Sequence, residues 1–178
     1  MSGRPTPGSP RGRGRRRPAA RPVRLFLLGE PNRGDDAAAF MAADLLASAA
    51  GLPAEIVPAG QLGPDSLVGL PAGTAVVIAD AVVGVPPGEL VTLPLAEVAA
   101  GGGPAPRSSH VMPLQQVLAL AEVIGGLPEG VFVGVGAASF ELGAGLSPAV
   151  RAALPSFAAA IADEIERLAA PASHGRRR

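Results

Sequence analysis

Four side chains in this sequence could together bind a metal ion or move protons: Asp35, Asp36, Asp80 and His110. The two adjacent carboxylates follow a short apolar run and a turn that contains Gly, and Asp80 ends a β-branched apolar run. His110 comes after a segment rich in Gly and Pro. Imidazole and carboxylates suit divalent ions of the Ni, Zn or Fe type, with water completing the coordination. The residue types therefore predict a divalent-metal site without selecting the metal.

Each of these residues also has an explanation that needs no metal. One acid of the Asp35–Asp36 pair, taken as Asp35, is expected to cap the helix that follows, and its replacement by Asn would then cost about 1 kcal/mol. His110 alone would be an ordinary histidine on an exposed loop. Asp80 is harder to explain in this way, because a carboxylate at the end of a buried strand costs several kcal/mol unless it is paired. The site prediction therefore depends on all of these groups converging.

The composition excludes several classes of site. The chain has no Cys, so it has no disulfide framework, no Cys-based zinc site and no thiol nucleophile. All 15 basic residues are Arg, which removes a Schiff-base lysine and a P-loop lysine. The turn from Gly29 to Asp36 is not Gly-x-Gly-x-x-Gly, and the sequence has no Gly-x-Ser-x-Gly. Dinucleotide binding and a serine triad are therefore disfavoured, and His174 is given no role.

Charges are segregated along the chain although the formal net charge is zero. Residues 1–24 hold eight Arg and no acid, 25–170 hold four Arg and all 15 acids, and 171–178 hold three Arg. An acidic core argues against nucleic-acid binding by the fold itself. We expect one domain at 23–170 between disordered tails, although the Arg-rich tail at 1–22 could contact RNA or anionic lipid. No apolar run is long enough for a membrane span or an export signal, so the expected location is cytoplasmic.

Hydrophobic periodicity predicts strands that alternate with helices. The predicted strands are 23–28, 54–57, 74–79 in the centre, 89–95 at an edge, and 131–135. The predicted helices are 37–50, 113–124, and a C-terminal pair that starts at Ser147 and restarts at Pro155. Their apolar faces are expected at Ala38, Met41 and Leu45, at Leu114, Val117, Leu118, Ala121 and Ile124, and at Phe157, Ile161, Ile165 and Leu168.

This alternation predicts an α/β fold with a mostly parallel, twisted sheet that is covered on both faces. Ligands bind at the carboxyl ends of the strands in such sheets. Asp35 and Asp36 follow the first strand, Asp80 ends the central one, and the loop with His110 follows the edge strand. We therefore expect these residues at one edge of the sheet.

Four stretches, in order, resemble the hydrogenase maturation endopeptidases that process the large subunit of [NiFe] hydrogenases. They are Leu25–Asp36, with a glycine six residues before an acidic pair; 76–81, an apolar strand that ends in Asp-Ala; Ser108-Ser109-His110 before an apolar helix; and 133–148, with Ser139-Phe140-Glu141 and Gly145-Leu146-Ser147-Pro148. The sequence departs from the family in three loops. Glu30 replaces Asn, Pro58–Gln61 replaces Asp-Gly-Gly-Thr, and Ala137–Ala138 replaces Pro-Glu.

The resemblance implies the family's three-layer α/β/α sandwich, of the phosphorylase/hydrolase-like type, and an aspartic-type endopeptidase activity. It implies metal binding by Asp36, Asp80 and His110 and substrate contacts from Glu30, Arg33 and Asp35. The catalytic residue is left unassigned, with Asp36 and Asp80 as candidates. The implied partner is the precursor of a [NiFe] hydrogenase large subunit, which loses a C-terminal extension after nickel insertion. Nickel is then carried by this substrate rather than held permanently.

Two alternatives stay open at this point. A non-catalytic relative could bind the nickel-loaded precursor as a checkpoint factor, which the altered loops favour. Another hydrolase or phosphorylase on a similar sandwich would turn over a small substrate without any hydrogenase partner.

Overall fold

Five strands form one sheet at the centre of the protein. A computed structural model describes residues 20–48, 51–102 and 112–171. Across the sheet the order is β2 (Glu55–Gly60), β1 (Val23–Leu28), β3 (Ala75–Val82), β5 (Gly130–Gly136) and β4 (Leu90–Pro94). Every neighbouring pair is parallel except β4 with β5, which is antiparallel. The predicted mostly parallel sheet, its central strand and its edge strand 89–95 are confirmed.

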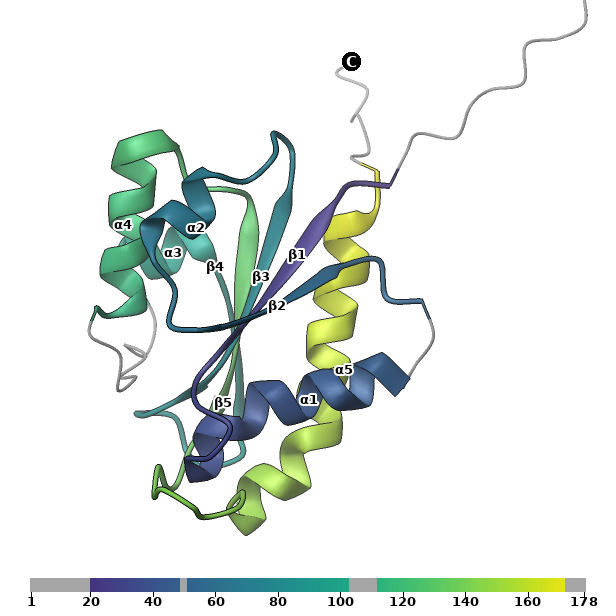
Figure 1. Cartoon of the computed structure of the whole chain (residues 1–178), viewed down its shortest axis with the longest axis vertical. Coiled ribbons are helices and arrows are strands. Elements are labelled where there is room, and N and C mark those ends of the chain that lie inside the picture. The colour runs from purple at the N-terminus through teal and green to yellow at the C-terminus, as the bar shows by residue number, and fades with distance from the viewer. Residues whose placement is uncertain (1–19, 49–50, 103–111, 172–178) are drawn as a thin grey trace, which may run out of the picture.

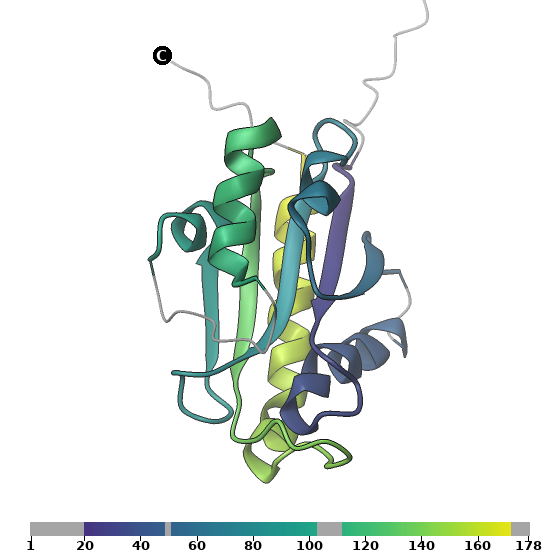
Figure 2. The same ribbon diagram turned by 60° about the vertical axis from the view of Figure 1, so that its left-hand side comes forward.

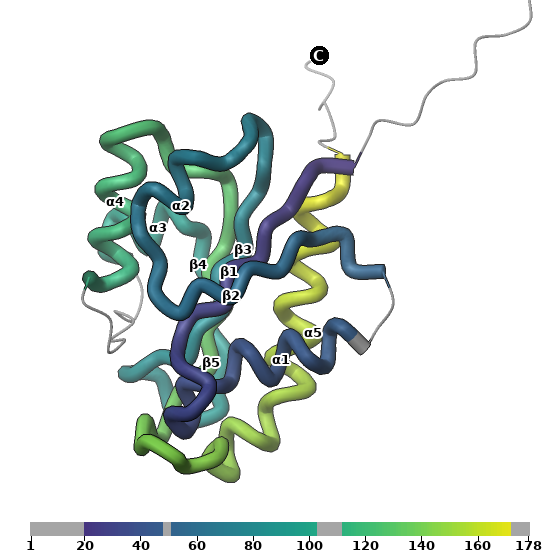
Figure 3. Tube along the Cα trace, viewed as in Figure 1, coloured from purple at the N-terminus to yellow at the C-terminus, as the bar shows by residue number. Residues whose placement is uncertain are grey.

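Helices cover both faces of this sheet (Figure 1). They are the 3₁₀ helix η1 (Gly34–Ala37), α1 (Ala38–Ser48), α2 (Pro64–Val68), α3 (Leu95–Ala99), α4 (Leu114–Gly125) and α5 (Pro148–Ala169). The trace in Figure 3 shows α1 and α5 on one side of the strands and α2, α3 and α4 on the other. The three-layer α/β/α sandwich is therefore confirmed. None of the helices in the described part of the chain combines the length and apolarity needed to cross a bilayer.

Strand β3 lies at the centre of both apolar layers. All eight of its residues are buried. Ala75, Val77, Ala79 and Ala81 belong to the cluster with α1 and α5, whereas Val76, Ile78 and Val82 belong to the cluster with α2, α3 and α4. A strand covered on both faces needs a nearly continuous apolar run, which is why its sequence could be recognised. It continues to Val82, so Asp80 lies inside the strand rather than after it.

Two predictions based on proline were wrong. The strand predicted at 54–57 continues as β2 through Pro58 to Gly60, because an edge strand tolerates a residue that donates no ladder hydrogen bond. Helix α5 is continuous through Pro155, where a restart was expected. Pro155 and Arg151 are both exposed, so water can reach the Arg151 carbonyl that loses its helical partner.

Alanine, more than the larger apolar residues, determines which face of α1 is buried. Ala38, Ala39, Ala42 and Ala43 are buried there, whereas Met41 and Leu45 are 43% and 45% exposed, contrary to expectation. Ile124 was also expected in the core and is 59% exposed at the end of α4. The predicted apolar series of α5 and the other four predicted positions of α4 are buried. The single-turn helices α2 and α3 were not predicted, since neither is long enough to show periodicity.

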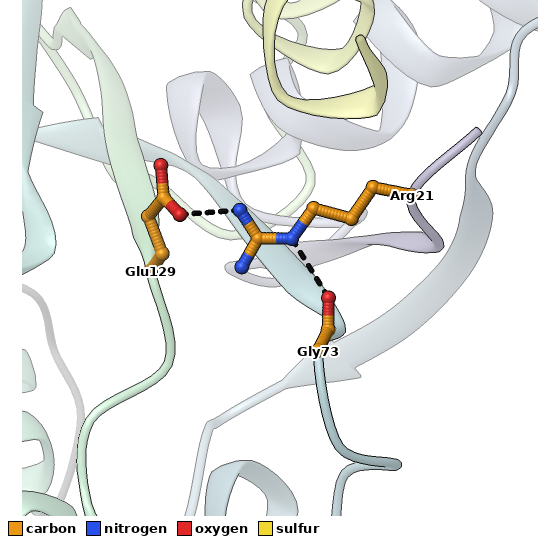
Figure 4. A network of polar contacts seen from close by, with 3 residues as sticks. All are labelled: Arg21, Gly73 and Glu129. Carbon is orange, nitrogen blue, oxygen red and sulfur yellow. Dashed lines mark hydrogen bonds and ion pairs between the residues drawn. The ribbon is translucent and has the colours of Figure 1, made fainter. Parts of the chain in front are cut away.

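Arg21 connects the amino ends of three neighbouring strands (Figure 4). Its Nε donates to the carbonyl of Gly73, just before β3, at 2.7 Å, and its Nη1 forms an ion pair with Glu129, just before β5. The Arg21 main-chain N–H donates to the Ala169 carbonyl at the end of α5, at 3.1 Å. Arg21 falls in the predicted tail 1–22, so the anchored part of the chain includes the last residues of that range. Nearly all of the rest of both predicted tails lies outside the described residues.

Replacing Arg21 by Ala should lower the free energy of unfolding by about 1 kcal/mol, because the protein loses the ion pair with Glu129 and the hydrogen bond to the Gly73 carbonyl. Arg167→Ala is the matched control. Arg167 is 55% exposed and pairs only with Glu164 among the contacts described, so its loss should stay below about 0.5 kcal/mol. Urea denaturation of the two variants measures the difference. Equal losses in both would contradict the anchoring role of Arg21.

Candidate functional site

The carboxyl ends of β1, β3 and β5 lie at one edge of the sheet, because these three strands are parallel neighbours. Three connections leave from this edge: the β1–η1 loop, the β3–β4 loop and the β5–α5 loop. Figure 2 shows them together at the lower end of the molecule. This carboxyl edge is opposite the edge that Arg21 anchors, and it carries the described residues that the sequence analysis selected.

Asp80 is the one charged residue of β3, and it is fully buried. The last residue pair between β1 and β3 joins Leu27 to Ala79, so Asp80 comes one position after the paired part of β1. On its other side it is in register with Gly134 of β5. One carboxylate oxygen of Asp80 accepts the Ala81 N–H at 2.8 Å. A buried carboxylate therefore lies in the central strand at the point where β1 leaves the sheet.

Asp36 is brought to the same edge by a sharp reversal of the chain after β1. Gly29 has φ +106°, and a Cβ at Gly29 would lie 2.2 Å from the Asp36 carbonyl oxygen and 3.2 Å from a carboxylate oxygen of Asp36. Only glycine fits at this approach. Asp36 is 2% exposed, and its helix η1 packs against β3, the strand of Asp80. The structure thus brings the predicted Asp36 and Asp80 to adjoining elements of one edge.

Asp35 holds two loops together through its side chain. Its carboxylate accepts three main-chain N–H groups of the β5–α5 loop: Ala138 at 2.8 Å, Ser139 at 3.1 Å and Ser147 at 2.6 Å. We call this arrangement the Asp35 clamp. Asp35 is fully buried, and its acceptors are directed at this loop rather than at solvent. The same residue was predicted to contact substrate, whereas the geometry favours a role inside the protein.

The interpretation of Asp35 as a helix cap was wrong. The residue that precedes η1 is Arg33, and the start of this helix has no hydrogen bond from a capping side chain. Asp35 instead binds the N–H of Ser147, whose hydroxyl caps α5 by accepting from Val150 at 3.4 Å. Sequence patterns could not predict this role, because all three partners of the carboxylate are main-chain N–H groups. Almost any residue type can supply such a group.

Main-chain hydrogen bonds join the same two loops. Asp35 N–H donates to the Ser139 carbonyl at 2.9 Å, Gly34 N–H to Ala144 at 3.1 Å, and Gly143 N–H to Asn32 at 2.8 Å. Gly34 has φ +54°, and a Cβ there would come within 2.8 Å of the Ser139 carbonyl oxygen. The β1–η1 loop and the β5–α5 loop therefore behave as one rigid unit beside Asp36.

The remaining predicted site residues have different outcomes. Glu30 is exposed and Arg33 is half-buried, both in the β1–η1 loop, and their contact with substrate stays a prediction. His110 lies outside the described residues. Within 20–48, 51–102 and 112–171, no three His, Asp or Glu side chains are grouped closely enough to hold a metal ion. Of the three predicted metal ligands, the described residues include Asp36 and Asp80. A site with three ligands would also need His110.

Comparisons with known proteins agree with this fold. The sequence model of the hydrogenase maturation protease family matches residues 42–164, from α1 to α5, a range that includes Asp80. No curated protein sequence matches the chain.

Solved structures of this family have the same fold. A hydrogenase maturating endopeptidase, HybD from E. coli, is 23% identical with a TM-score of 0.66, over 82% of this chain and 92% of that one. A [NiFe] hydrogenase maturation protease, HybD from Thermococcus kodakarensis, is 24% identical with a TM-score of 0.61, over 83% and 98%. A second protease from that organism, HycI, is 24% identical with a TM-score of 0.62, over 84% and 95%.

Replacing Asp35 by Asn should lower the free energy of unfolding by about 2–3 kcal/mol, more than the loss expected of a helix cap. The amide would turn an NH₂ group toward a main-chain N–H and would remove charge from three hydrogen bonds. Asp163→Asn, on the exposed side of α5, is the matched control and should change stability by less than about 0.5 kcal/mol. Chemical denaturation of both variants tests this, and equal stability would show that the clamp is dispensable.

Proposed function

Because the chain belongs to the hydrogenase maturation protease family and is thus a hydrogenase maturation endopeptidase, we propose that it cleaves the precursor of a [NiFe] hydrogenase large subunit. The cleavage removes a C-terminal extension after nickel has been inserted. The observation that carries this proposal is that two buried carboxylates, Asp36 and Asp80, lie on adjoining elements at the carboxyl edge. This is the edge at which parallel α/β sheets bind their ligands.

In this proposal the nickel of the precursor is part of the substrate. Asp36, Asp80 and His110 would contact the ion, since two carboxylates and an imidazole are donors that divalent nickel accepts. Recognition of the ion would then restrict cleavage to precursors that already carry nickel. The proposed site uses no thiolate, because the chain has no Cys, and this suits transient contact with an ion that the precursor keeps.

The chemical step is hydrolysis of one peptide bond. A water molecule attacks the scissile carbonyl, and Asp36 or Asp80 accepts the proton that this water loses. The C–N bond then breaks, and the departing nitrogen takes up a proton. The mature subunit is left with a new C-terminal carboxylate and the extension leaves with a free amine. The nickel, the two carboxylates or both can orient the water.

The segments that depart from the family pattern take part in main-chain contacts near the site. Gly60, within the altered segment Pro58–Gln61, accepts from the Gly29 N–H at 2.9 Å. Ala138, where the family often has a charged residue, contributes its main-chain N–H to the Asp35 clamp. Because these contacts do not use side chains, the substitutions leave the framework of the site intact. The altered segments are therefore no evidence for a non-catalytic checkpoint factor over a processing enzyme.

Asp80→Asn should reduce the rate of precursor processing at least 100-fold while the melting temperature stays within a few degrees. The amide keeps an oxygen for the Ala81 N–H but neither binds nickel as a carboxylate nor accepts a proton. Asp36→Asn should behave in the same way. Intact-mass measurement of a nickel-loaded precursor before and after incubation records the loss of the extension.

Asp163→Asn is again the control, and it should process the precursor at the wild-type rate. Full processing by both the Asp36 and Asp80 variants would overturn the assignment of the site. Unfolding of the Asp80 variant would mean that its carboxylate is a structural acceptor. Absence of processing by the wild-type protein, with tight binding of the nickel-loaded precursor, would identify a checkpoint factor instead.

His110→Ala should remove processing and also the pH-dependent part of nickel binding. A neutral imidazole is the ligand, so nickel affinity of the wild type should fall as the pH falls through about 6.5, where an ordinary histidine gains its proton. Titration calorimetry with nickel at pH 7.5 and pH 5.5 compares the two proteins. Identical affinities at both pH values would exclude His110 from the site.

A further inference from the structure

A large apolar side chain projects from the carboxyl edge on a tight turn. Leu142 is 75% exposed, and it occupies the second position of the turn Glu141–Ala144 in the β5–α5 loop. The Ala144 N–H donates to the Glu141 carbonyl at 3.3 Å, and Gly143 has φ +77°. A positive φ at the third position is typical of a type II turn, where glycine is the usual residue.

This turn is fixed to the body of the protein on both sides of Leu142. Gly143 donates to the Asn32 carbonyl, and the Ala144 carbonyl accepts from Gly34. The Asp35 clamp holds the two ends of the same loop, at Ala138 and at Ser147. Leu142 is therefore presented to solvent by a loop that is already ordered. An ordered contact loses less conformational entropy on binding than one on a flexible loop.

The position of Leu142 relates it to the candidate site. Its turn is bonded to Asn32 and Gly34, in the loop that leads directly into Asp36. Two further apolar side chains are partly exposed at this edge: Val83, three residues after Asp80 and 38% exposed, and Leu90, 37% exposed. The exposed acids Glu30, Glu89 and Glu141 lie in the same loops. Exposed apolar and polar side chains thus occur together on these loops, and protein–protein interfaces combine an apolar centre with a polar rim.

We infer that Leu142 is a specificity-determining docking residue, on which an apolar surface of the large-subunit precursor packs while its scissile segment reaches Asp36 and Asp80. The inference rests on the proposed function, because it takes the precursor as the occupant of this edge. The precursor is the expected partner because the turn of Leu142 is hydrogen-bonded to the loop that leads into Asp36, so a substrate bound at Asp36 lies next to this turn. Leu142 itself has no part in the chemical step, so it acts on binding.

The test is a steady-state kinetic comparison with nickel-loaded precursor. Leu142→Gln should raise KM for the precursor about fivefold to tenfold, as expected for the loss of one buried leucine contact, with kcat within twofold of wild type. Leu142→Met should restore KM, because methionine supplies similar apolar volume. Val123→Gln is the control: Val123 is 83% exposed at the end of α4, near the opposite edge, and its replacement should change neither constant.

The outcomes separate this inference from the proposed function. If the wild-type protein does not process the precursor, the proposed function fails, and with it the premise of this inference. If the wild type processes it and Leu142→Gln has the wild-type KM, the docking role is overturned and the proposed function stands. A fall in kcat alone would also overturn it, because a docking residue acts on binding. Light scattering adds a check: a dimer that Leu142→Gln converts to a monomer, with KM unchanged, would assign the turn to self-association.

Discussion

The carboxylate of Asp35 is the interaction on which the rest of the site depends. It joins two loops that are more than 100 residues apart in sequence, and it satisfies three main-chain N–H groups at once. A buried carboxylate is costly unless donors replace its water, and here the donors come from the loop that needs to be held. Asp36 follows directly in the chain, so its position is fixed by the same contact. The start of α5 and the turn of Leu142 are fixed from the other side.

The Arg21 contacts and the candidate site lie at opposite ends of the sheet. At the amino edge, Arg21 ties the starts of β1, β3 and β5 to one another and to the end of α5. At the carboxyl edge the same three strands release the loops that carry the carboxylates. The apolar layers on either side of β3 connect the two ends. The positions that depart from the family resemblance, Glu30, Pro58–Gln61 and Ala137–Ala138, lie at or after the carboxyl ends of strands and outside the buried core.

The elements that were predicted correctly are those whose apolar residues form a recognisable run or a helical repeat in the sequence. The continuous apolar run of β3 and the helical series of α5 did so, and the strand-end rule was enough to bring Asp36 and Asp80 to one edge. Predictions from apolar patterns were wrong where alanines or main-chain groups determine the structure. Alanines bury α1 while Met41 and Leu45 stay exposed, and Pro155 sits on the solvent side of an unbroken helix. The role of Asp35 was beyond pattern analysis for the same reason, and that of His110 stays a prediction.

The long sequence separation across the Asp35 clamp bears on when the enzyme can become active. The carboxylate and its partners are 103 to 112 positions apart, so the loop closes only after nearly the whole domain is available to fold. Strands β1 and β3 can pair earlier in synthesis, but the β5–α5 loop that supplies the partners of Asp35 is then still missing. A half-synthesised chain has only the three strands β1, β2 and β3, and it lacks the β5–α5 loop at the carboxyl edge. The Asp35 clamp is therefore among the last contacts of the domain that can form.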